Sequence, residues 1–455
     1  MSQHFAAIGR HSERTLMLGG ILLASVASAV TGFVLAQYYS VDIPTTLTGV
    51  GEDCWVDWGV RIGRHCFSDY AMTVDEGMRA DPWGPYPVFM PWDNYQAGWV
   101  NYPAAAMLPH LLFGVPAKLL GVPQLGLLGF LLALTLAVLT PAVWASRGAR
   151  GLERVVVLVA LGAAAMPAWV VIDRGNSVGF LAPVGLAFLL GLRRERWRLV
   201  ALMVILAALL KPQFALLAVA LFAARQWKWG AVAVGGAVTA NLAAYLLWPR
   251  DFPRTLAQSL HGVLGYGGSP YAVTSPYNVS FASVLFHLTN RAAPLFGYAV
   301  VLVLVVCVFV LGRRIPPVLV GIVLLAAANL FPVMAFKYYL VFALPVAALV
   351  ARDPDGPPGL SLVDRRAVGV CVSAAAVLSI VWIALPGPPI QALIAGQNGV
   401  IGIAGTTPYV ATTVAAASML WLVACVVIVV SYARKPAQPT AFLPAVAPVT
   451  TSTRD

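Results

Sequence analysis

The residues of this sequence that could do chemistry begin with a carboxylate near the start of the chain. Asp57 lies in the segment CWVDWGV between Trp55 and Trp58, and tryptophans of this kind anchor a segment at a membrane–water interface. Partial desolvation at an interface raises the pKa of a carboxylate, which suits it to accept a proton from a hydroxyl group. We take Asp57 as the candidate base. Asp53 and Asp69 are its rivals, and a solvated loop acid is the alternative for each.

Three isolated cations each end an apolar segment further along the chain. They are Arg174 in VIDRGNS, Lys211 in LLKPQ and Lys337 in MAFKYYL. Cations at the ends of different helices can converge on one phosphate through charge-assisted hydrogen bonds. The alternative is that these long side chains extend to the interface and only mark its position. Asn176 and Asn278 could add neutral polar contacts.

The cysteines and histidines predict no metal centre. The sequence has no CxxC motif, and its six histidines are scattered, so we expect no metal and no other cofactor. It also lacks a Gly-rich phosphate loop, and Asp353-Pro-Asp355 is more simply a turn than a metal-binding DxD motif. Cys54 and Cys66 share an outer segment in which an oxidising compartment permits a disulfide, a pairing that spacing alone leaves open.

These residues are set in a very apolar chain. Of 455 residues, 60% are hydrophobic and 10% are charged, whereas a soluble globular protein has roughly 25% charged residues. The charge is too sparse to cover a water-facing surface, which excludes a soluble enzyme, a disordered tail and a nucleic-acid binder. The apolar residues come in blocks of about twenty, the length that crosses a hydrocarbon core of ~30 Å. The chain is therefore predicted to be an all-α polytopic membrane protein whose partner is the lipid bilayer.

We expect about 12 transmembrane helices, with both termini in the cytoplasm. This orientation places nearly every closely spaced arginine pair inside, as the positive-inside rule requires. The net charge of +11 is then explained by basic cytoplasmic loops. No signal-peptide cleavage pattern follows the first span, which we expect to be retained. The expected spans are residues 15–37, 123–145, 154–172, 178–192, 198–210, 213–225, 229–248, 292–312, 316–334, 338–351, 368–386 and 411–432.

The spans and the segments between them are predicted to form one membrane domain over residues 1–435. Residues 38–102 are predicted to be a long extracytoplasmic loop, too long to be a mere connector, and residues 249–291 a second one. Residues 103–121 contain three prolines, a histidine and a lysine, which indicates an interfacial helix. The Pro/Ala/Thr-rich residues 436–455 are expected to be a disordered cytoplasmic tail.

The short spans on either side of Lys211 indicate that this lysine has a special environment. Each arm is only about 20 Å long at 1.5 Å per residue. If both arms start in the cytoplasm, Lys211 lies below the outer surface of a ~30 Å hydrocarbon core. A lysine at that depth is costly unless it faces a polar cavity or an anion. The alternative is one long span centred on Lys211, which would invert every later loop.

Taken together, the pattern resembles the GT-C glycosyltransferases and, more narrowly, glycosyltransferase family 87. That family includes polyprenyl-phosphate-mannose-dependent mannosyltransferases of bacterial lipoglycan synthesis. The resemblance covers about residues 15–350 in short motifs. Two of them depart from the family pattern, which usually has Tyr-Pro-Pro at 101–103 and a histidine in place of Lys337. The matching pieces are Asp57, Val60 and Tyr70; Asn-Tyr-Pro at 101–103; Gly175-Asn176; Leu-Lys-Pro at 210–212; and Phe-Pro, Lys-Tyr-Tyr and Leu-Pro within 331–345.

The resemblance implies a GT-C-like fold and an inverting hexosyltransferase of the plasma membrane. Its donor would be a polyprenyl-phosphate sugar, with mannose as the sugar, and its acceptor a glycolipid or polysaccharide at the outer face. Asp57 would deprotonate the acceptor hydroxyl, and the leaving phosphate would be compensated by Lys211 and Arg174, with Lys337 as a further contact. The residues expected to bind substrate are Asn176, Tyr70 and Asn278.

Three other functions remain open from the sequence. A polyprenyl-phosphate-arabinose-dependent arabinofuranosyltransferase would have a similar architecture. A transporter or flippase of lipid-linked sugars would also break helices and bury a lysine, although such proteins usually have internal repeats and we find none. A scaffold for envelope assembly would have no need of the candidate base.

Overall fold

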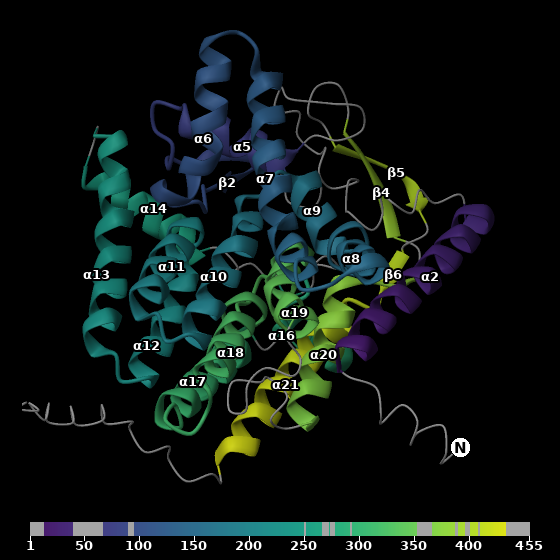
Figure 1. Cartoon of the computed structure of the whole chain (residues 1–455). Coiled ribbons are helices and arrows are strands. Elements are labelled where there is room, and N and C mark those ends of the chain that lie inside the picture. The colour runs from purple at the N-terminus through teal and green to yellow at the C-terminus, as the bar shows by residue number, and fades with distance from the viewer. Residues whose placement is uncertain are drawn as a thin grey trace, which may run out of the picture.

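The computed structural model is a largely helical protein (Figure 1). It describes residues 13–39, 67–89, 95–249, 252–265, 273, 278–291, 294–352, 366–386, 390–395, 401–407 and 410–433. Several residues of the sequence predictions lie outside the described residues, namely Asp53, Cys54, Asp57, Cys66 and the tail 436–455.

Among the described residues, four helices are long and apolar enough to cross a membrane. A fifth candidate is a bent pair in which α8 (Gly151–Leu158), continued by the π-helical turn η1 (Val159–Ala163), meets α9 (Met166–Arg174) at 43°. Pro167 lies in the first turn of α9, where its missing N–H group does not interrupt the helix. The four long helices are α2 (Glu13–Tyr39), α7 (Pro123–Ser146), α13 (Trp227–Ala244, extended by η4, Tyr245–Leu247) and α21 (Ala415–Ala433).

The remaining apolar helices are shorter than the roughly 20 residues that cross a bilayer, so the number of twelve spans stays a prediction. They pack into one core in which nearly every side chain of α18 and α19 is buried. These helices are α10 (Leu181–Arg193, preceded by η2, Ser177–Phe180), α11 (Trp197–Leu210), η3 (Pro212–Ala218) with α12 (Val219–Ala223), α17 (Pro294–Val310), α18 (Pro317–Leu330), η5 (Lys337–Phe342) with α19 (Ala343–Arg352), and α20 (Arg366–Ile380).

The two long loops contain helices that the sequence analysis did not anticipate. The described part of the first loop holds α5 (Ser68–Gly77) and an antiparallel hairpin of β1 (Tyr86–Phe89) and β2 (Tyr95–Gly98). The second holds α14 (Arg254–Gly265) and α16 (Phe281–Thr289). The expected interfacial segment is the helix α6 (Ala104–Leu119), which stands beside α7 (Figure 1) and packs against α5.

Two predicted span boundaries are wrong: the C-terminal end of the span at 368–386 and the N-terminal end of the span at 411–432. Helix α20 stops at Ile380 and α21 starts at Ala415, and β3 (Ala384–Pro386) pairs with β6 (Val410–Thr412) between them. Pro386 has no N–H group for a helical hydrogen bond, so the apolar run continues as a strand. A second antiparallel pair, β4 (Ile390–Ala395) with β5 (Ile401–Thr407), lies beyond it.

Helix α5 is held against α6 and the end of α13 by close packing and by polar contacts. Gly114 of α6 faces Val74 so closely that an added Cβ would lie 2.3 Å from a Val74 methyl group. Lys118 of α6 forms an ion pair with Asp75, and the Trp248 indole donates to the Gly77 carbonyl oxygen at 2.9 Å. The packing and the Trp248 hydrogen bond fix the position of α5, whereas the ion pair joins two partly exposed side chains (27% and 28% exposed) and adds little stability.

We predict that Gly114→Ala lowers the free energy of unfolding by about 1–3 kcal/mol, because the added methyl group overpacks the contact with the stiff Val74 side chain. Gly235→Ala in α13 is the matched control, since an added Cβ there meets nothing within 4 Å. We expect the control to be neutral or slightly stabilising. Thermal unfolding in detergent measures both, and equal midpoints for the two variants would contradict the packing argument.

Candidate functional site

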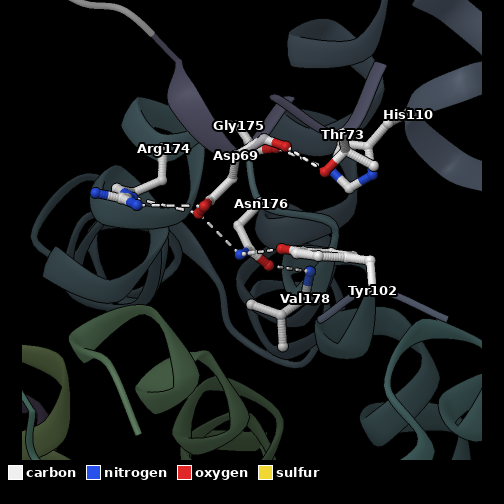
Figure 2. Close-up of polar contacts among 8 residues, drawn as sticks. All are labelled: Asp69, Thr73, Tyr102, His110, Arg174, Gly175, Asn176 and Val178. Atoms are coloured by element: carbon white, nitrogen blue, oxygen red, sulfur yellow. Dashed lines mark hydrogen bonds and ion pairs between the residues drawn. The ribbon is translucent and has the colours of Figure 1, made fainter. Parts of the chain in front are cut away.

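The centre of the candidate site is a buried carboxylate, Asp69, in the first turn of α5. Its two oxygens accept hydrogen bonds from Arg174 Nε and Nη2, both at 3.2 Å. Asn176 Nδ2 donates a third, at 2.9 Å. Figure 2 shows both donors pointing at Asp69 from the same turn of the chain. A guanidinium that engages both oxygens of a carboxylate fixes its orientation as well as its charge.

The turn that carries both donors follows from the sequence Arg-Gly-Asn. Helix α9 ends at Arg174, and Gly175 adopts a left-handed conformation with φ of 63°, which glycine takes without steric cost. An added Cβ at this glycine would lie 2.8 Å from Tyr70 Cβ. Asn176 then begins η2 by accepting from the backbone N–H of Val178 at 2.9 Å. The reversal therefore aims the side chains on either side of Gly175, those of Arg174 and Asn176, at Asp69.

His110 of α6 also contacts this turn, and the sequence did not single it out. Its Nε2 donates to the Gly175 carbonyl oxygen at 3.1 Å. The ring is fully buried, stacked on Phe130 with centroids 4.9 Å apart and edge-on to Tyr102. Its spacing in the sequence gave no signal, because the contact depends on how α6 packs against α9.

Tyr102 joins the Asp69 cluster to Lys211. Its hydroxyl accepts from Asn176 Nδ2 at 3.1 Å, and Lys211 Nζ lies 3.5 Å from the centre of its ring. Lys211 has an extended backbone at the break between α11 and η3, and it is only 9% exposed. The aromatic face therefore stabilises a largely desolvated ammonium group.

Asp69, Arg174 and Lys211 line one cavity of about 460 Å³. Glu76 of α5 lines the same cavity, together with aromatic and amide side chains that include Tyr86, Trp99, Asn101, Tyr102, Gln213 and Tyr338. Two carboxyl groups and two cations thus line one cavity. Within the described residues, no group of three or more His, Cys, Asp or Glu side chains could hold a metal ion.

The two carboxyl groups of the cavity differ in charge state. Burial alone would raise the pKa of Asp69, but Arg174, Asn176 and Lys211 outweigh burial and hold the pKa below its usual value. Burial raises the pKa of Glu76 to about 8, although Tyr86 and Arg79 act in the opposite direction. At neutral pH, Asp69 is therefore ionised and Glu76 is mostly protonated.

An apolar groove of about 1040 Å³ adjoins the polar cavity. Its walls are side chains of α6, α10, α11 and the end of α13, among them Leu108, Leu112, Val184, Leu206 and Leu247. Residues that are adjacent in the chain line the groove and the cavity respectively. Gly77 and Leu210 face the groove, while Glu76 and Lys211 face the cavity.

Other residues predicted from the sequence are not among the residues that line the cavity. Lys337 is buried, with Nζ 5.7 Å from the centre of the Trp382 ring. Tyr70 lies in the core against His110 and Phe130. Asn278 joins two chain segments: its Nδ2 donates to the Val333 carbonyl oxygen at 2.7 Å, and its Oδ1 accepts from the backbone N–H groups of Ser280 and Ala335.

We predict that the protein loses stability as the pH rises from about 6.5 to about 8, above the range in which the buried His110, with its pKa lowered from 6.5 to about 4, acts in the opposite direction. Glu76 has a folded pKa of about 8 against an ordinary value of 4.5, so over this interval the folded state keeps a proton that the unfolded state releases. Glu76→Gln removes this difference, and its thermal midpoint should fall less over the same interval. Asp75→Asn is the control, and a wild-type slope in Glu76→Gln would contradict the assignment.

The comparison with known families agrees with the resemblance noted in the sequence. The model of glycosyltransferase family 87 matches residues 99–336, more than half of the chain. The matched region contains Tyr102, Arg174, Asn176 and Lys211, and α5 with Asp69 precedes it. No curated protein matches the sequence at a significant level. The chain belongs to glycosyltransferase family 87 and is a glycosyltransferase with apolar helices suited to a membrane.

Proposed function

We propose that this enzyme transfers a hexose, mannose, from a polyprenyl-phosphate donor to a lipid or glycan acceptor, with inversion at the anomeric carbon. The reaction takes place at the outer face of the plasma membrane, in a GT-C-like fold. The observation that carries the proposal is the cavity in which the carboxylate of Asp69 lies with Arg174 and Lys211. A base and phosphate-binding cations are the groups that this transfer requires.

The apolar groove supports a lipid-linked donor. Its walls are almost entirely aliphatic and aromatic, which suits a hydrocarbon chain and disfavours a nucleotide. Because Leu210 lines the groove and Lys211 lines the cavity, a chain in the groove brings its phosphate to the ammonium group of Lys211. The positive charges then stay with the phosphate as it leaves.

The chemistry assigns one role to each charged group. Asp69 accepts the proton of the acceptor hydroxyl while that oxygen forms a bond to the anomeric carbon. The bond from the anomeric carbon to the phosphate oxygen breaks, and its electron pair leaves with polyprenyl phosphate. Lys211 and Arg174 offset the charge on that phosphate. Phosphate is a competent leaving group, so a second carboxylic acid is unnecessary, unlike in glycosidases.

We propose Asp69 as the base in preference to Asp57, because Asp69 is held by two donors within the cavity. Asp57 lies outside the described residues and is the alternative base. Asn176 acts as a positioning residue, since its amide is committed to Asp69, Tyr102 and Val178.

Asp69→Asn is predicted to lower transfer from synthetic polyprenyl-phosphate mannose to octyl α-mannoside by about 10²–10⁴-fold, because the amide accepts no proton. Donor binding should be retained. The measurement uses purified protein in nanodiscs, with Asp57→Asn and Asp75→Asn expected to behave as the wild type. Loss of transfer in Asp57→Asn with full turnover in Asp69→Asn would identify Asp57 as the base.

The same assay separates the competing functions. Transfer from polyprenyl-phosphate arabinofuranose in place of the mannose donor would make the enzyme an arabinofuranosyltransferase. Failure of the wild type to transfer either sugar would contradict the proposed reaction.

We predict that the Tyr102 ring holds Lys211 in position for the phosphate. Tyr102→Leu removes the aromatic face and should weaken the binding of sugar-free polyprenyl phosphate by about tenfold, as expected for a desolvated cation–π contact. Tyr102→Phe keeps the face and should bind nearly as the wild type. Titration of polyprenyl phosphate into nanodisc-embedded protein measures both, and equal losses would show that the hydroxyl contact matters instead.

A further inference from the structure

The catalytic proposal leaves one buried carboxyl group of the cavity without a role. Glu76 follows Asp69 by two helical turns on α5, so both side chains project from one face, about 10 Å apart along the axis. Both line the same cavity, and Glu76 is only 2% exposed. The neighbouring Asp75 pairs instead with Lys118 and is absent from the cavity lining.

The surroundings of Glu76 match the chemistry of a neutral polyhydroxyl ligand. Tyr86 interacts with its carboxyl group, and the guanidinium of Arg79 lies 5.4 Å from the centre of the Tyr86 ring. Trp99 and Asn101 line the same cavity. Carboxyl, phenol and amide groups exchange hydrogen bonds with hydroxyls, and aromatic faces cover the apolar side of a sugar ring.

Charge divides the cavity between two kinds of ligand group. In one part, the two positive charges of Lys211 and Arg174 exceed the single negative charge of Asp69, so an anionic phosphate is stabilised there. Glu76 has no hydrogen-bonded cation among the described residues, so a phosphate beside its ionised carboxylate would be repelled. The part of the cavity around Glu76 is therefore suited to an uncharged group.

On the basis of the proposed function, we propose that Glu76 and Tyr86 form a subsite that binds the hydroxyl groups of a neutral sugar ring. The sugar is either the one that the donor carries or the terminal sugar of the acceptor. A mostly protonated Glu76 both donates and accepts hydrogen bonds, which suits a ring with several hydroxyl groups.

The experiment compares three ligands in nanodiscs: sugar-free polyprenyl phosphate, polyprenyl-phosphate mannose and octyl α-mannoside. Glu76→Gln should weaken at least one mannose-bearing ligand by about tenfold, the usual effect of a lost hydrogen bond to a buried polar group. Its affinity for polyprenyl phosphate should be unchanged. Asp75→Asn is the matched control on the same helix and should match the wild type for all three ligands.

The pattern of losses identifies the source of the sugar. Weaker binding of octyl α-mannoside alone assigns the subsite to the acceptor, and weaker binding of polyprenyl-phosphate mannose alone assigns it to the transferred sugar. Tyr86→Phe should show the same pattern, and it tests the proposal independently if Glu76→Gln does not fold.

Two results would overturn the proposal. Unchanged binding of both mannose-bearing ligands would remove the subsite, and an equal loss for sugar-free polyprenyl phosphate would make Glu76 a structural residue. Transfer by the wild type is measured in parallel. If the wild type transfers sugar while Glu76→Gln binds all three ligands normally, only this inference fails, whereas absence of wild-type transfer contradicts the proposed function.

Discussion

The burial of the Asp69 carboxylate is the constraint on which the rest of the site depends. An ionised carboxylate removed from water is unfavourable unless opposite charge and hydrogen bonds replace its hydration. Arg174 and Asn176 provide both, and they can do so only because α9 ends in a left-handed glycine between them. His110 secures that turn, and Tyr102 links it to Lys211. The loop helix α5 and the membrane helices are thereby connected through one charge cluster.

Much of the helical framework could be predicted from the sequence, because apolar runs and helix breakers are local signals. Helix α7 begins at Pro123 and α11 ends just before Lys211, as the apolar runs and the Lys-Pro break indicate. The strand pair β3–β6 was not predicted, since a short apolar run next to a helix has no periodicity that separates strand from helix. The helices inside the two long loops are short and partly polar, so the sequence pattern predicts loops there.

The arrangement of the site could be predicted only in part. Arg174, Asn176 and Lys211 stood out because a charge or an amide at the end of an apolar helix is unusual. The choice among Asp53, Asp57 and Asp69 depends on a contact between residues 105 positions apart, and nothing in local spacing encodes it. Glu76 and His110 escaped notice for the same reason, because their importance arises from burial against other elements. Lys337 is buried near Trp382 and is not among the residues that line the cavity, so its expected role at the phosphate stays a prediction.

The apolar groove and the polar cavity meet at residues that are adjacent in the chain, since Gly77 and Leu210 line the groove while Glu76 and Lys211 line the cavity. An amphiphile with its tail in one space and its headgroup in the other would have its polar–apolar junction held at these residues. The groove is open to the exterior, so the far end of a long tail need not be enclosed. For the proposed donor, the junction between the isoprenoid chain and the phosphate then sets the position of the scissile bond. Isoprenoid chains of different lengths would therefore place that bond at the same point of the cavity.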